Sequence, residues 1–95
     1  MGVNKETNQR VLRCSSSTDA NKLAGSIHSS YQENPESTII IRVIGAGALN
    51  QAVKASIICN KFFAKKGIVI GFQPSFQDTA ENMTAIELKI LFISI

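Results

Sequence analysis

Hydrophobic and polar positions change their spacing along the chain, and each spacing predicts one kind of element. Residues 38–44 are mostly β-branched, which predicts a strand packed on both faces. In residues 83–93 apolar side chains alternate with polar ones, the period of a half-buried strand. Apolar positions in residues 20–31 recur at helical spacing, and Asn34-Pro35 stops that helix. Good helix formers then fill residues 48–66, where Gly67 can end the helix.

These patterns give the element order βαβαββ. The expected strands are residues 9–15, 38–44, 68–73 and 83–93, with a turn-rich connection at residues 74–82. Two βα units place their strands parallel through right-handed crossovers, and the last two strands pair as a hairpin. We therefore expect an α/β fold in two layers, a four-stranded mixed sheet with two helices on one face. Residues 1–8 are expected to be a flexible tail and residues 9–95 a single domain.

Composition narrows the class of protein. With 95 residues, 44% of them hydrophobic, and no apolar run near the roughly twenty residues of a membrane helix, one soluble domain is expected. Two cysteines are far below the density of a secreted disulfide scaffold, which favours a cytoplasmic or nucleoid-associated protein. The net charge of +3 is compatible with a polyanionic partner.

Residue types suited to catalysis or metal binding are sparse. His28 is the only histidine, and no cysteine or carboxylate cluster is spaced to join it. Cys14 and Cys59 are separated by a whole βαβ unit and form no Cys-x-x-Cys motif. The sequence therefore predicts a protein that is not an enzyme and that has no metal, no cofactor and no small-molecule substrate.

The segment from Ile44 to Ala55 joins a strand to a helix through two glycines, Gly45 and Gly47. Glycines leave no Cβ, so another backbone or a ligand can come close to the first turn, where N–H groups are unpaired. One interpretation is a tight connection that needs small residues, and another is contact with an RNA or DNA backbone. Dinucleotide binding fits less well, because the third glycine of that fingerprint is replaced by Asn50.

The helix at residues 48–66 is the second candidate feature. At about 100° per residue, Asn50, Lys54, Lys61 and Lys65 fall within one sector, which is either a solvated face or a phosphate-binding stripe. The apolar face is expected on the opposite side, at Leu49, Ala52, Val53, Ser56, Cys59, Phe63 and Ala64. Ile58 and Phe62 flank the lysines, where they would either join the core or form the interface of a homodimer.

Two arginines fall within predicted strands. Arg13 and Arg42 either lie on an exposed face of the sheet or extend the basic stripe of the helix.

The glycine segment also carries a resemblance. Residues 44–55 resemble the signature of the stage V sporulation protein S family, small bacterial proteins of the Alba superfamily. Residues 11–15 match the first strand of that family and residues 22–27 its first helix, so the likeness covers roughly residues 10–91. The resemblance implies an Alba-like two-layer topology, a regulatory role in sporulation, nucleic-acid binding and dimers.

More distantly, residues 47–53 are similar to the Alba run Arg-Ala-Ile-Ser-Lys-Ala-Val, whose lysine touches nucleic acid. Gln51 stands at that lysine position and Gly47 at the arginine position. A lysine pair that Alba proteins carry after the first strand falls near Ser16 and Ser17. Both sites therefore lack the cations of the Alba pattern.

Together these observations predict a homodimer that binds DNA or RNA with low sequence preference. The expected contacts are backbone and polar groups at Gly45, Gly47, Asn50 and Gln51, with basic groups at Lys54, Lys61, Lys65, Arg13 and Arg42. The alternative is a structural or protein-interaction module whose lysines serve only solubility.

Overall fold

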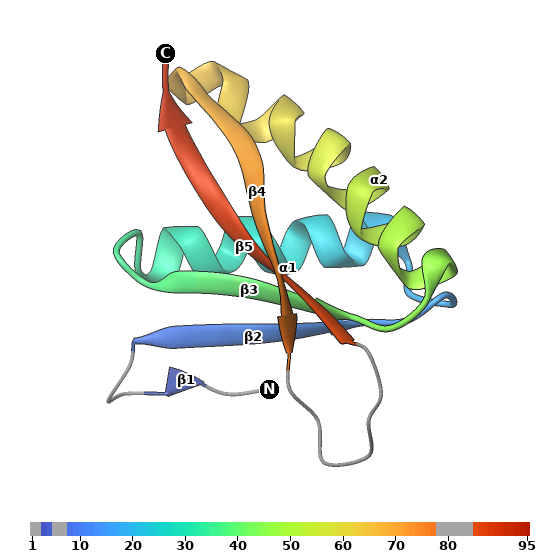
Figure 1. The fold of residues 1–95 in the computed structure, drawn as a ribbon. Helices are drawn as coiled ribbons and strands as arrows, with labels where there is room; N and C mark the ends of the chain where they lie inside the picture. Colours follow the sequence, from blue (N-terminus) through green and yellow to red (C-terminus); the bar gives the residue numbers. More distant parts are fainter. Residues whose placement is uncertain (1–2, 5–7, 78–84) are drawn as a thin grey trace.

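The computed structural model describes residues 3–4, 8–77 and 85–95, with side chains from residue 8 onward. Figure 1 shows the helices packed beside a twisted sheet. The elements are β1 (Val3–Asn4), β2 (Gln9–Cys14), α1 (Ala20–Glu33), β3 (Thr38–Val43), α2 (Ala46–Phe63), a short 3₁₀ turn η1 (Ala64–Lys66), β4 (Ile68–Gln77) and β5 (Ala85–Ser94).

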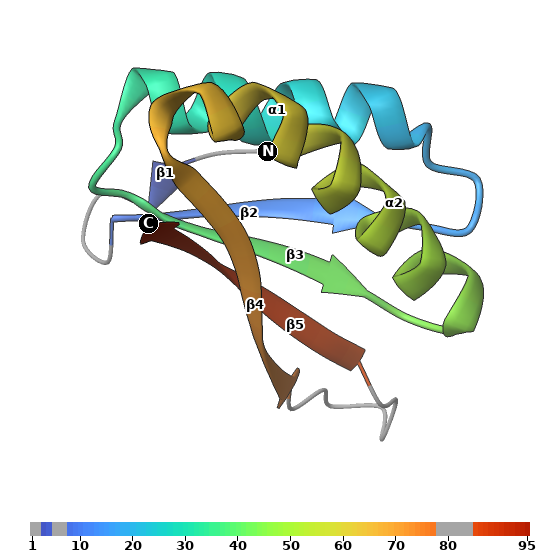
Figure 2. The ribbon, with the colours of Figure 1, turned by 90° about the horizontal axis from the view of Figure 1, so that it is seen from above.

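The sheet has the strand order β1-β2-β3-β5-β4. β2 and β3 are parallel, with Leu12 opposite Ile41, and the β3–β5 and β4–β5 pairs are antiparallel. Both helices lie on one face of the sheet, as Figure 2 shows. The predicted α/β class, the order βαβαββ and the four-stranded mixed sheet are therefore confirmed, and β1 adds a fifth strand by pairing with Gln9 and Arg10.

The core lies between the sheet and the helices. Alternate strand residues point into it, because successive side chains of a strand face opposite sides. Its buried strand residues are Leu12, Cys14, Ile39, Ile41, Val43, Ile70, Leu88 and Ile90. The helices contribute Leu23, Ala24 and Ile27 from α1 and Ala48, Ala52, Ala55, Cys59 and Phe63 from α2. The other face of the sheet, which we call the open face, is not covered by either helix.

Element ends differ from the sequence prediction chiefly at α2, which also passes into η1 after Phe63, and at β4. α2 begins at Ala46, two residues earlier than expected, and the turn-rich connection expected from Pro74 is wrong for residues 74–77, which belong to β4. The backbone N–H of Ile70 points away from β5 and donates to Asn60 Oδ1 at 3.0 Å. Pro74 is four residues after Ile70 on this edge strand, so its backbone nitrogen also points away from β5. The N–H that proline lacks therefore removes no hydrogen bond to β5. The rest of the expected connection, residues 78–82, lies outside the described residues.

The ends of the helices follow from local chemistry. Asp19 caps α1, where its Oδ1 accepts from the backbone N–H groups of Asn21 at 2.9 Å and Lys22 at 3.4 Å. Gly67 closes the turn after α2 with φ 70° and ψ 30°, the left-handed conformation expected of this glycine.

Candidate nucleic-acid interface

The glycine turn between β3 and α2 has an unusual backbone at Gly45. Its φ of 92° and ψ of 158° lie in a region that only glycine adopts without strain. The carbonyl of Gly45 accepts the first helical hydrogen bond, from the N–H of Leu49 at 3.1 Å, and no side chain caps the helix. Gly45 is therefore required by the sharp turn itself.

Gly47 is required by a different contact, with the loop that joins β2 to α1. A Cβ placed on Gly47 would lie 2.8 Å from the Cβ of Ser16, closer than real side chains approach. Two bonds hold the loop there, from Gln51 Nε2 to the carbonyl of Thr18 at 2.7 Å and from Cys14 Sγ to the carbonyl of Ala48 at 3.3 Å. The half-buried Gln51 amide is thus already engaged within the fold.

The structure brings together the two segments that resemble Alba sites. Ser16 and Ser17 are exposed beside the first turn of α2, where Gly47 and Asn50 are exposed as well. Ser17 donates its backbone N–H to Ser15 Oγ at 3.3 Å, so the loop is braced by its own hydroxyl groups. This corner offers hydroxyl, amide and backbone N–H groups, and its cations come from further along α2.

Lys54 and Lys61 of α2 and Lys65 of η1 are all exposed. Helical periodicity puts the two α2 lysines on the side opposite its buried residues. Every charged residue from Ser37 to Gln77 is a cation, namely Arg42, Lys54, Lys61, Lys65 and Lys66. We call Asn50, Lys54 and Lys61, together with Lys65 of the adjoining η1, the basic face of α2. Lys66 was not predicted, and its ammonium lies over the rings of Tyr31 at 5.6 Å and Phe63 at 5.5 Å, so it packs against aromatics.

The buried side of α2 differs from the predicted one. It is built from Ala48, Ala52, Ala55, Cys59 and Phe63. The prediction that Val53 and Ala64 belong to it is wrong, since Val53 is 41% exposed and Ala64 is exposed. Small side chains let the helix pack closely, with Cys59 Sγ donating to the carbonyl of Ala24 at 3.2 Å. The signal in the sequence that identifies the buried side is the recurrence of Ala48, Ala52 and Ala55 at helical spacing, rather than the positions of the large apolar residues.

Apolar side chains flank the basic face on both sides. Ile58 packs against the core, whereas Phe62 is 43% exposed and stacks on His28 with ring centroids 5.0 Å apart. Val53 and Ile57 lie on the other flank, and Ile57, which the sequence analysis missed, is 57% exposed. The homodimer interface at Ile58 and Phe62 stays a prediction, with only Phe62 well exposed.

The two arginines are not brought next to the basic face. Arg13 and Arg42 are neighbours in the register of β2 and β3 and project from the open face, so the sheet lies between them and α2. Arg42 donates from Nε and an Nη to one oxygen of Glu87, at 3.1 and 2.9 Å. Its charge is therefore locally compensated, while Arg13 is exposed.

The two thiols and the histidine are packed against other parts of the fold. Burial raises the pKa of Cys14 and raises the pKa of Cys59 to about 11, so both stay protonated at neutral pH and are weak nucleophiles. His28 packs between the rings of Phe62 and Phe63. Among the described residues, no group of three or more His, Cys, Asp and Glu side chains is placed to hold a metal ion. Neither α1 nor α2 has the length and hydropathy that crossing a bilayer requires.

A comparison with known protein families identifies the family of this chain. The family model for stage V sporulation protein S matches residues 10–93. The matched stretch runs from β2 to β5 and includes the glycine turn, the basic face and the open face. The chain belongs to the stage V sporulation protein S family, and so to a group of small sporulation-related proteins.

Proposed function

We propose that this protein is a small regulatory protein that binds DNA or RNA through the basic face of α2, in the cytoplasm or at the nucleoid. The observation that supports this most is the exposure of Lys54, Lys61 and Lys65 in a stretch without any carboxylate. Lysines that contact phosphates release counterions, and this release supplies most of the affinity of sequence-independent binding.

The start of α2 adds a second set of donors to the proposal. The first N–H groups of a helix have no partner within it, and the helix dipole favours negative charge there. At Gly45 nothing lies within 4 Å of the position that a Cβ would take, so a phosphate can approach these N–H groups from that side without meeting a side chain. Phosphate contacts carry no sequence information, so the proposal includes a low sequence preference.

A titration with labelled DNA and RNA tests the proposal. In Lys54→Ala/Lys61→Ala, two phosphate contacts are lost, and the slope of log affinity against log salt should become shallower by about 0.7–0.9 per lysine. Fluorescence anisotropy at several salt concentrations measures this slope. Lys22→Ala, which removes an exposed ammonium from α1, is the matched single control for Lys61→Ala and should leave the slope nearly unchanged.

Two results would reject this function. One is the absence of binding at low salt, and the other is an equal effect of Lys22→Ala and Lys61→Ala on the slope. Either result favours a protein-interaction module, for which the exposed Val53 and Ile57 beside the lysines are the supporting observation.

We also propose that the protein is a homodimer in which Phe62 lies at the interface. Burial of an exposed aromatic side chain contributes roughly 1.5–3 kcal/mol to association. Light scattering should give twice the chain mass of 10.3 kDa, and Phe62→Ser should shift the sample toward 10.3 kDa. A wild-type mass of 10.3 kDa at high micromolar concentration would disprove the dimer.

A further inference from the structure

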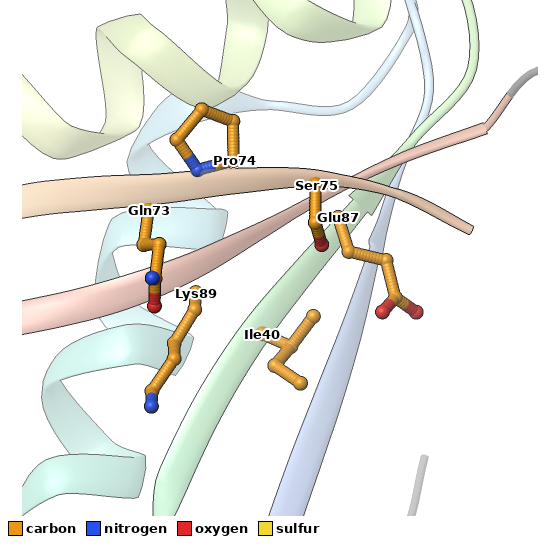
Figure 3. A pocket seen from close by; sticks show the side chains of 6 residues that line it. All are labelled: Ile40, Gln73, Pro74, Ser75, Glu87 and Lys89. Carbon is orange, nitrogen blue, oxygen red and sulfur yellow. The ribbon is translucent and has the colours of Figure 1, made fainter.

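A pocket of about 280 Å³ lies on the open face of the sheet, away from the basic face of α2. Figure 3 shows the side chains that line it. The lining residues are Ile40 of β3, Gln73, Pro74 and Ser75 of β4, and Glu87 and Lys89 of β5. Its volume is near the lower end of the roughly 300–1,000 Å³ typical of small-molecule sites, a size that suits one planar ring system.

The acidic side of the pocket is held in place. Arg42 donates both of its bonds to Oε2 of Glu87, and the side chain of Glu87 is only 22% exposed. Among the described residues, Oε1 of Glu87 accepts no hydrogen bond. An oriented carboxylate with one unused oxygen is an acceptor for a ligand with N–H donors.

The other side of the pocket is cationic. Lys89 lies two residues after Glu87 on the same face of β5, and its side chain is exposed. In the sheet register Gln73 is opposite Lys89 and Ser75 is opposite Glu87, which adds an amide and a hydroxyl group. Ile40, 8% exposed, supplies an apolar surface in this pocket. The pocket thus offers an acceptor, a donor and an apolar contact within one hollow.

We propose that this pocket binds a guanine base, a proposal that rests on and deepens the nucleic-acid function above. Guanine presents acceptors at N7 and O6 beside donors at N1 and N2 on one continuous edge. Lys89 donates to the O6 and N7 side, Glu87 accepts from the N1 and N2 side, and the ring packs on Ile40. The base comes from a single strand, whose unstacked bases are free to enter, or from a free nucleotide.

The same geometry disfavours adenine. Adenine has an acceptor at N1, which would face the carboxylate of Glu87, and a donor at N6, which would face the ammonium of Lys89. An oriented pair of polar groups discriminates by about 1–3 kcal/mol, which corresponds to a preference of about 5- to 150-fold for guanine. Since the α2 lysines contact phosphates only, this preference is separate from the affinity that they supply.

The experiment compares two labelled oligouridylate strands that carry either one central guanine or one central adenine. Fluorescence anisotropy should show about tenfold tighter binding of the guanine strand. Glu87→Gln and Lys89→Met should each reduce this ratio toward one while affinity for the adenine strand stays within about twofold. Glu33→Gln is the matched control, because Glu33 also pairs with an arginine, Arg10, and lies outside the pocket.

Free guanosine and adenosine monophosphates identify the source of the base. Displacement of the guanine strand by the guanosine nucleotide, together with a higher melting temperature, supports a nucleotide site. Preference for the guanine strand without displacement supports recognition in a single strand. Equal binding of both strands, or a preference that survives Glu87→Gln, overturns the inference and leaves the α2 function standing. If neither strand binds, the proposed function of α2 is rejected. In that case the guanine pocket is tested by the melting temperature alone. The inference is overturned if both nucleotides raise the melting temperature equally or if neither raises it.

Discussion

Phe63→Ala is expected to lower the free energy of unfolding by about 3–5 kcal/mol. The Phe63 side chain is fully buried and is the hub of an aromatic cluster. Its ring meets Tyr31 at 5.0 Å, Phe92 at 5.3 Å and His28 at 5.5 Å between centroids, and truncation would remove one ring contact from each of them. Small domains are stable by only about 5–15 kcal/mol, so this one change removes a large part of the total.

Urea denaturation followed by circular dichroism measures the loss. The neighbouring Phe62→Ala is the matched control, because Phe62 is 43% exposed and, among the aromatic rings of the described residues, stacks on His28 alone. It should cost clearly less than Phe63→Ala, since nearly half of Phe62 is already exposed to water, whereas Phe63 is fully buried. Similar losses for the two variants would show that the aromatic cluster does not anchor α2 to α1 and the sheet.

The fold could be predicted because strand and helix patterns in this chain are local. The β-branched run at 38–43 and the alternation from residue 85 onward each report burial directly, and Gly67 marks a helix end by its conformational freedom. The extent of β4 was not predictable in this way. Pro74 indicates a turn in most contexts, and only the position of β4 at the sheet edge makes it compatible with a strand.

The candidate site depended on information that a single sequence lacks. Exposure of Lys54 and Lys61 followed from helix periodicity, but the exposure of Ile57 depends on which side of α2 meets the sheet. Likewise, Arg13 and Arg42 could be assigned to strands, while their separation from α2 follows from the face that the helices cover. The pocket between Glu87 and Lys89 depends on the pairing of β4 with β5, which joins residues across the hairpin.

Gly47→Ala is expected to lower the free energy of unfolding by about 1–3 kcal/mol, because its Cβ would overlap the Cβ of Ser16. In an unobstructed helix the same change stabilises by roughly 0.5–1 kcal/mol. Gly25→Ala in α1 provides that control, since nothing lies within 4 Å of the added Cβ. Thermal and urea unfolding should therefore show a lower free energy of unfolding for Gly47→Ala and a higher one for Gly25→Ala.

The second variant of this experiment, Ser16→Gly, removes the atom that the new methyl group would meet. In that background Gly47→Ala should be neutral or stabilising, and the coupling between the two changes should be at least about 1 kcal/mol. Without this rescue, close packing against Ser16 is not the reason for the glycine.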